Sequence, residues 1–214
     1  MKSSAVASAR PRRASSRIFR LASYFFLALG LSTLGYSVYV VVDARAYQAY
    51  EQSKFEAKLE KGTGSPQLSA TPLVEGGIIG EIQVPRLHLK AIVVQGDSHT
   101  ILRRAVGHIP ETALPGTPGN VALAGHRDTF FRPLRNIKLG DAITLKTSAG
   151  DFQYLVESTQ VVPAANIEVL NTTAVPTLTL ITCFPFDYLG AAPNRFVVRA
   201  REVVSQPPDA HSVP

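Results

Sequence analysis

Cysteine is almost absent from this chain of 214 residues, which contains only Cys183. A single cysteine excludes an intrachain disulfide framework and any zinc site that needs two thiolates. Charged residues are also few, at 18% of the chain, whereas 45% of the residues are hydrophobic. These are globular proportions, and they exclude wholesale disorder, collagen and a low-complexity array. The length leaves room for one ordinary domain and a short additional segment.

The folded part of the chain lacks a surplus of positive charge. Residues 1–20 hold six basic side chains and no acidic one, which accounts for the whole net charge of +6. A nucleic-acid-binding domain needs its positive charge on the folded surface. We therefore expect no nucleic-acid partner.

Several motifs that carry chemistry are missing. The sequence has no GxSxG, GxxxxGK or GxGxxG, and no two histidines have HxxxH or HxxEH spacing. These absences exclude the serine-hydrolase elbow, the phosphate loop and the dinucleotide fingerprint, and they disfavour a histidine metal site. We expect neither a cofactor nor a metal.

An uncharged run does occur near the N-terminus, over Leu21–Val42. At about 1.5 Å per residue, a helix of this length crosses a hydrocarbon core of about 30 Å. A cleaved signal peptide has a shorter apolar stretch, and a buried soluble helix is less uniformly apolar. Because the basic residues precede the run, the positive-inside rule predicts a cytoplasmic N-terminus and an extracytoplasmic remainder.

Composition divides the chain into five predicted segments. Ala, Glu, Lys and Gln favour a helix after the apolar run, and Gly, Ser, Thr and Pro then indicate a linker. The segments are a basic cytoplasmic tail (1–20), a transmembrane helix (21–42), a helical stalk and flexible linker (43–73), a folded domain (74–204) and a disordered tail (205–214).

The folded domain has the pattern of an all-β protein. Short alternating or β-branched runs are separated by Gly, Pro, Asp and Asn, with no long amphipathic helix among them. Such spacing is typical of a sandwich or a closed barrel. Seven strands are predicted, at 78–84, 89–94, 120–124, 142–147, 152–161, 177–183 and 196–204.

Cys183 ends the apolar strand TLTLITC. On the outer side of a membrane an unpaired thiol is either buried, cross-linked or used, so a small core residue and a nucleophile both fit. Strand alternation places Leu178 and Leu180 on one face and Thr179, Ile181 and Cys183 on the other. The second face is less apolar, which favours a thiol that faces a groove.

Arg195 and His126 are the polar partners that the predicted strands offer. If the strands 177–183 and 196–204 pair as antiparallel neighbours, Cys183 and Arg195 lie side by side at the two ends of the connecting loop. A guanidinium there can hold an oxyanion, although a solvated basic strand face is the alternative. His126 follows Gly125 at the end of a strand, where an isolated histidine is either structural or catalytic. Asp128 fits both an orienting partner for His126 and a surface cap.

A thiol, an imidazole and a guanidinium at three strand ends would supply a nucleophile, a proton carrier and an oxyanion clamp. The reaction class that this combination predicts is acyl transfer through a thioester.

The segments AGHRDTFFRPL, LTLITCFPF and NRFVVRA resemble the sortase family of membrane-anchored cysteine transpeptidases, and HRDTFFRPL is most similar to its class D branch. The likeness covers about residues 75–204, and Thr179–Cys183 fits the family pattern TLxTC. It implies a closed or nearly closed β-barrel of about eight strands, so a further strand is expected near 105–109.

The resemblance also implies roles for individual residues. Cys183 would attack the substrate carbonyl and hold the acyl-thioester, and His126 would protonate the leaving amine. Arg195 would hold the oxyanion or position the peptide, and Thr182 would line the substrate groove. Some members bind calcium in an acidic loop cluster; this sequence has no dense carboxylate cluster, so no metal requirement is expected.

The implied substrates are secreted proteins with a C-terminal sorting signal like LPxTG, cleaved between Thr and Gly and joined to an amine of the cell envelope or of another protein. The implied location is the bacterial cytoplasmic membrane. Two other interpretations stay open: a membrane-tethered β-barrel that grips a peptide without cutting it, and an L,D-transpeptidase acting on peptidoglycan. The second disagrees with the Thr182 and Phe184 that flank the thiol.

Overall fold

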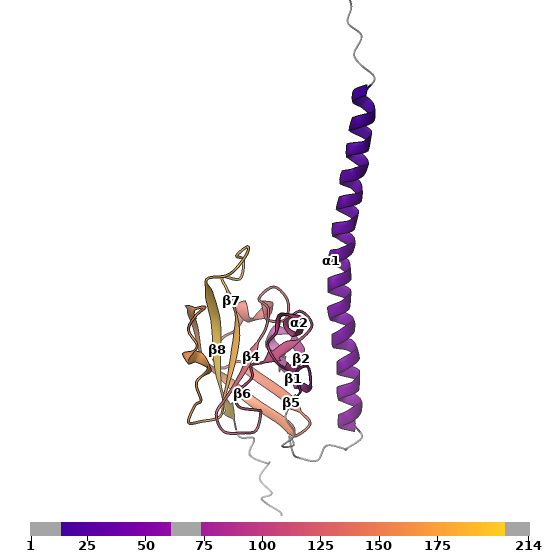
Figure 1. Cartoon of the computed structure of the whole chain (residues 1–214). Coiled ribbons are helices and arrows are strands. Elements are labelled where there is room, and N and C mark those ends of the chain that lie inside the picture. The colour runs from indigo at the N-terminus through magenta and orange to yellow at the C-terminus, as the bar shows by residue number, and fades with distance from the viewer. Residues whose placement is uncertain (1–13, 61–73, 204–214) are drawn as a thin grey trace, which may run out of the picture. The chain divides into compact units, whose positions relative to one another are not determined.

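The computed structural model describes residues 14–60 and 74–203, which form one long helix and a β-barrel (Figure 1). By its internal contacts the chain divides into two units, residues 1–43 and 44–214. The expected linker over 61–73 and the expected tail after 204 lie outside the described residues, as do residues 1–13 of the basic tail.

Helix α1, Ala14–Glu60, contains the apolar run and continues beyond it. Its segment Phe19–Lys54 is long and apolar enough to cross a membrane. The hydroxyls of Ser23, Ser32 and Ser37 each donate to the carbonyl four residues earlier, at 2.8–2.9 Å. These polar groups are therefore satisfied within the helix, as an apolar environment requires.

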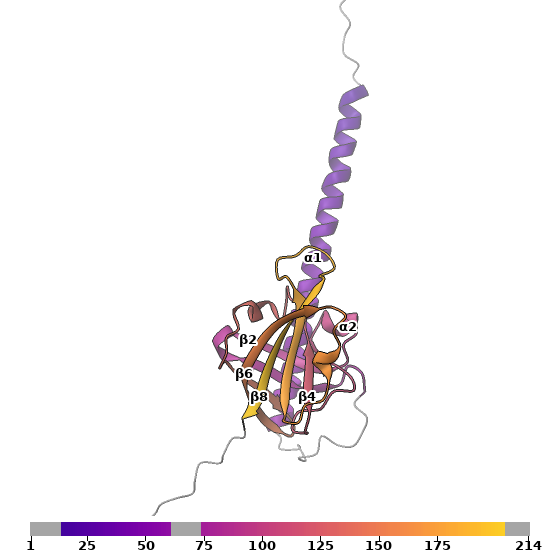
Figure 2. The same ribbon diagram turned by 90° about the vertical axis from the view of Figure 1, so that its left-hand side faces the viewer.

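The second unit contains a closed barrel of eight strands in the order β1-β2-β3-β4-β7-β8-β6-β5 (Figures 1 and 2). The expected eight-stranded barrel is confirmed. The strands are β1 Ile78–Val84, β2 Leu89–Gln95, β3 Val106–His108, β4 Asn120–Ala124, β5 Ala142–Thr147, β6 Gly150–Pro163, β7 Thr177–Phe184 and β8 Asn194–Val203.

Most predicted strands agree with the structure within two residues at each end. The additional strand expected near 105–109 is the three-residue β3, and the hairpin expected around residues 148–151 joins β5 to β6. Two pairings are parallel, β2 with β3 and β4 with β7. Short single-turn helices occupy some connections: α2 His99–Leu102, η1 Pro85–Leu87, η2 Arg132–Asn136 and η3 Glu168–Leu170.

The barrel interior is filled by aliphatic side chains from every strand, because alternate residues of a strand point inward. Leu123, Leu145, Leu178 and Leu180 are all fully buried in this core. Phe131 is the large aromatic that joins them from the β4–β5 connection, and it too has no exposed surface.

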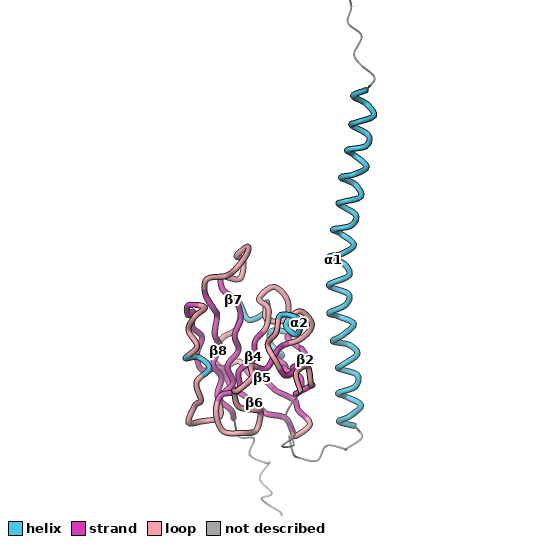
Figure 3. The backbone as a smooth tube through the Cα atoms, in the orientation of Figure 1, coloured by secondary structure: helices cyan, strands magenta, loops and turns pink. Residues whose placement is uncertain are grey.

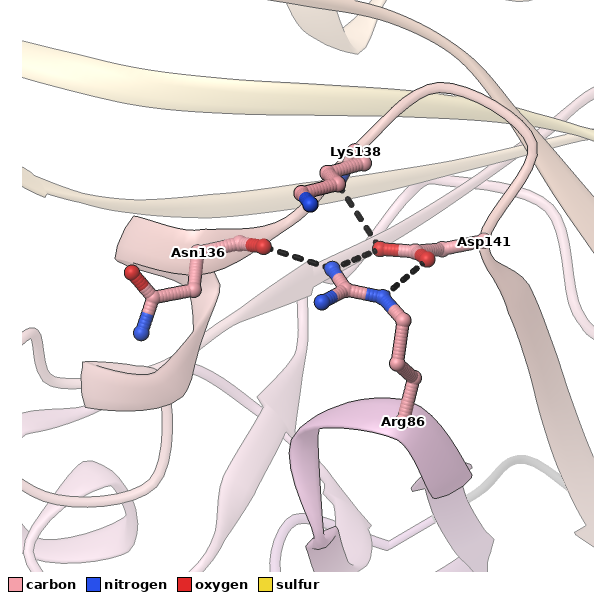
Figure 4. Close-up of polar contacts among 4 residues, drawn as sticks. All are labelled: Arg86, Asn136, Lys138 and Asp141. Carbon is pink, nitrogen blue, oxygen red and sulfur yellow. Dashed lines mark hydrogen bonds and ion pairs between the residues drawn. The ribbon is translucent and has the colours of Figure 1, made fainter.

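Arg86, in η1, braces the connection between β4 and β5 (Figure 4). Its guanidinium donates to both carboxylate oxygens of Asp141, at 2.5 and 2.6 Å, and to the carbonyl of Asn136, at 2.5 Å. The backbone N–H of Lys138 completes the arrangement, 2.7 Å from an Asp141 oxygen. The Arg86 hydrogen bonds hold the pKa of Asp141 below its usual value, so the carboxylate stays charged. This clamp fixes the C-terminal end of the connection that begins at Gly125.

Asn120 ties β4 to its parallel neighbour and to the β6–β7 connection. Its side-chain oxygen accepts a hydrogen bond from the Thr179 hydroxyl at 2.6 Å. Its amide donates to the carbonyls of Val169 and Asn171, at 3.0 and 3.2 Å. Asn120 and Thr179 are buried. Buried polar groups need hydrogen-bond partners, and these three hydrogen bonds supply them.

Candidate active site

Cys183 lies near the end of β7 with a free, half-buried thiol. Leu178 and Leu180, on the even-numbered face of the strand, have no exposed surface and belong to the barrel core. Side chains alternate along a strand, so Cys183 belongs to the opposite face. The sulfur therefore points away from the aliphatic core of the barrel and is partly exposed.

Arg195, at the start of β8, is the direct cross-strand partner of Cys183. Residues paired in this way in antiparallel strands have β-carbons about 4.5–5.5 Å apart, on the same face of the sheet. The Arg195 guanidinium donates to the carbonyls of Ala192 and Asn194, at 3.2 and 3.0 Å. The antiparallel pairing expected for these strands is confirmed, and the C-terminal half of the β7–β8 connection orients the arginine.

His126 reaches the same end of the barrel through the parallel pairing of β4 with β7. Ala124 pairs with Ile181, and the backbone N–H of Gly125 donates to the Ile181 carbonyl at 3.1 Å. His126 lies two residues beyond this last pair, just after the end of β4, and Cys183 lies two residues beyond it on β7. The topology thus brings the backbones that carry the imidazole and the thiol to the same end of the barrel.

The turn that carries His126 is built on a buried ring. A β-carbon added at Gly125 would lie 2.7 and 2.8 Å from two atoms of the Phe131 ring, so the backbone passes too close for any side chain. The Phe131 N–H donates to the His126 carbonyl at 3.0 Å. The turn formed by residues 125–131 therefore packs its own backbone against the Phe131 ring, and this packing fixes the backbone of His126.

His126 is half-buried and lies beside a second histidine. Its ring and that of His99, in α2, are 6.0 Å apart between centroids, in an edge-to-face arrangement. Burial is the main cause that lowers the pKa of His126; Asp128 opposes this shift and His99 adds to it. The neutral imidazole is therefore favoured, which suits a group that accepts and returns a proton near neutral pH.

Thr182 lies on the core side of β7, only 2% exposed. Its hydroxyl donates to the carbonyl of Gly125 at 2.7 Å. This hydrogen bond joins the residue before the thiol to the residue before the imidazole. A role for Thr182 in substrate binding stays a prediction; the contact that the structure gives it is with the backbone of the histidine turn.

The β7–β8 connection, residues 185–193, projects beyond the end of the barrel and contains neither helix nor strand (Figures 1 and 3). An aromatic group supports its base: the ring centroids of Phe184, Phe186 and Phe196 lie 5.4–6.3 Å apart. Arg135 of η2 forms an ion pair with Asp187 at 2.9 Å. The connection is thus attached to the segment that follows His126.

Chemically, this end of the barrel carries a thiol, an imidazole and a guanidinium, groups that can serve as nucleophile, proton carrier and cationic hydrogen-bond donor. Sequence analysis named all three as candidates, but it assigned no role to His99, which no motif distinguished, or to Arg127, which it quoted only as part of the HRDTFFRPL segment. Among residues 14–60 and 74–203, no group of three or more His, Cys, Asp or Glu residues is placed to hold a metal ion. The expectation of a metal-independent reaction stays a prediction.

Comparison with known proteins gives a consistent result. A family model described as a sortase domain matches residues 82–203. Sortase D of Bacillus subtilis (strain 168) is 28% identical over 190 residues, which cover 84% of this chain and 96% of that protein.

Solved structures agree with this match. Sortase C of Clostridium perfringens, solved with the C-terminal cell wall sorting motif, is similar with a TM-score of 0.58 and 27% identity, over 76% of this chain and 89% of that one. The sortase D5 transpeptidase of Clostridium perfringens has the same fold, with a TM-score of 0.60 at 24% identity, over 76% of this chain and 99% of that one.

Proposed function

The chain belongs to the sortase family, and we propose that it is a membrane-anchored cysteine transpeptidase that cleaves a C-terminal sorting signal like LPxTG and transfers the product to an amine. A related sortase C has been solved with a C-terminal cell wall sorting motif, which supports a substrate of this class.

The observation that carries the proposal is the register of three neighbouring strands. Cys183 pairs with Arg195 across β7 and β8, and the β4–β7 register brings His126 to the level of the thiol. A purely structural cysteine would not need an arginine on one side and a histidine on the other. This combination supports thiol catalysis over simple peptide binding.

The proposed reaction has two acyl-transfer steps. His126 takes the proton of the Cys183 thiol as the sulfur attacks the carbonyl carbon of the Thr-Gly bond, and Arg195 donates hydrogen bonds to the oxyanion that forms. His126 protonates the departing glycine nitrogen, which leaves a thioester on the sulfur. An incoming amine then attacks the thioester carbonyl, loses its proton to His126 and releases the thiolate.

Thr182 acts indirectly in this scheme. Its hydroxyl bonds the Gly125 carbonyl, so it fixes the distance between the strand ends that carry the thiol and the imidazole. Helix α1 would hold the enzyme in the bacterial cytoplasmic membrane with its N-terminus inside, because the basic residues precede the apolar run. The acceptor amine belongs to the cell envelope or to another protein.

The test is mass spectrometry of the full chain in detergent after incubation with Leu-Pro-x-Thr-Gly peptides. We expect an acyl adduct on Cys183 that disappears in Cys183→Ala, a variant that removes one sulfur and leaves the fold intact. Peptide binding without an adduct would instead identify a non-catalytic peptide-binding barrel. An adduct formed only from a peptidoglycan stem peptide would identify an L,D-transpeptidase.

A further inference from the structure

Arg127, the residue after His126, holds the β7–β8 connection through its backbone. One guanidinium nitrogen donates to the Pro185 carbonyl at 3.1 Å. The other donates to the carbonyls of Tyr188 and Gly190, at 2.5 and 3.1 Å. The guanidinium also lies 5.9 Å from the centroid of the Tyr188 ring. One side chain thus contacts the connection at three points spread over six residues.

The tip of this connection has little support from packing. Leu189 is 95% exposed and Tyr188 is 46% exposed, whereas the base is held by the aromatic group and by Arg135. Exposed loop segments with few apolar contacts open at low free-energy cost. The charge-assisted hydrogen bonds of Arg127 to Tyr188 and Gly190 are therefore the main attachment described for the tip.

The C-terminal half of the same connection orients Arg195. That guanidinium donates to the carbonyls of Ala192, in the connection, and of Asn194, the first residue of β8; Ala192 lies two residues after the segment bound by Arg127. Displacement of residues 188–190 would move these carbonyls, and the oxyanion clamp with them. A chain of contacts therefore runs from the residue beside His126, through the connection, to the residue opposite Cys183.

From this chain of contacts we infer that Arg127 is a positioning residue of the transpeptidation reaction. It fixes the β7–β8 connection so that Arg195 faces the carbonyl under attack, and it makes no contact with the reacting atoms itself. The inference rests on the proposed function, because it assigns Arg127 an effect on the acylation of Cys183. A lysine cannot replace it, since one ammonium lacks the planar fork that reaches three carbonyls.

The test uses the full chain in detergent and single-turnover acylation of Cys183 by Leu-Pro-x-Thr-Gly peptides. In Arg127→Ala we expect the acylation rate at saturating peptide to fall about 10- to 100-fold. Arg127→Lys should recover only part of it. Arg132→Ala is the matched control, because Arg132 is an exposed arginine in the β4–β5 connection, which also contains Arg127. Its acylation rate should stay within about twofold of that of the unmodified protein.

A double-mutant cycle separates positioning from a general loss of structure. In an Arg195→Ala background, the Arg127→Ala substitution should change the remaining rate less than about twofold, because the group through which it acts is gone. Hydrogen exchange should rise in residues 185–193 of Arg127→Ala and stay unchanged in the barrel strands. Equal losses in both backgrounds, or unchanged exchange in this segment, would overturn the inference.

The two proposals fail in distinguishable ways. If the unmodified chain forms no acyl adduct with any peptide, the proposed function fails, and with it the effect of Arg127 on acylation. If the unmodified chain acylates and Arg127→Ala acylates as fast as Arg132→Ala, only the inference about Arg127 fails. Should Arg127→Ala not fold, the same comparisons are made with Arg127→Gln, which keeps most of the side-chain volume.

Discussion

The close approach of Gly125 to Phe131 predicts that Gly125→Ala destabilises the barrel. The added methyl would meet the ring at 2.7–3.0 Å, and the ring has no room to retreat because Phe131 is fully buried in the core. Overpacking of this kind typically costs about 1–3 kcal/mol. We expect the free energy of unfolding to fall by that amount.

A smaller partner should relieve the clash. Phe131→Leu alone should cost about 1–2 kcal/mol, since it removes part of a buried ring and leaves a cavity. Combined with Gly125→Ala, the methyl would fill part of this cavity. The double variant should therefore lose about 1–2 kcal/mol less than the sum of the single losses.

Urea unfolding of the full chain in detergent measures these energies. The sequence has no tryptophan, so near-ultraviolet circular dichroism of tyrosine, including the buried Tyr154, reports on the barrel core. Additive losses in the double variant, or a change below about 0.5 kcal/mol in Gly125→Ala, would refute this account of the turn. The acylation rate of Gly125→Ala should also fall, because the turn positions His126.

Two further predictions concern buried polar groups. Asn120→Ala should lower the free energy of unfolding by about 2–3 kcal/mol, because it leaves the Val169 and Asn171 carbonyls and the Thr179 hydroxyl without their partner; a loss below about 0.5 kcal/mol in urea unfolding would contradict this. Burial lowers the pKa values of His108 and His126 below the usual 6.5. The unfolded chain therefore binds protons more readily, and the free energy of unfolding should fall as the pH drops below about 6.5. The limit is about 1.4 kcal/mol per pH unit for each group, and a flat profile between pH 7.5 and 5.5 would contradict this assignment.

The fold was largely predictable because strand signals are local. Alternation and turn residues marked seven of the eight strands, and β3 was expected only through the family resemblance because three residues are too few to show a period. The extension of α1 beyond the apolar run was also predictable from composition. The helix continues without a break from the apolar run to Glu60, since residues favourable to helix formation follow directly and no Gly or Pro intervenes before residue 61.

The site was predictable in part. The pairing of Cys183 with Arg195 could be predicted because one connection joins two antiparallel strands, and these two residues lie at its ends. The position of His126 depends on a parallel pairing between strands separated by more than 50 residues, and alternation does not reveal which strands become neighbours. Arg127 was missed because its partners are backbone carbonyls, which leave no trace in the side-chain sequence.

The register of β4 against β7 is the feature on which both stability and chemistry depend. Asn120 and Thr179 hold it near one end, and Thr182 holds it at the other through the Gly125 carbonyl. Because side chains alternate with a period of two, a slip of one residue would turn Cys183 into the core and Thr182 outward. The slip would also bury the sulfur in place of the Thr182 hydroxyl and leave the side-chain oxygen of Asn120 without its Thr179 partner. The hydrogen bonds that make this pair of strands stable therefore also select the one register that keeps Cys183 off the core side of β7, at the end of the barrel where His126 follows β4.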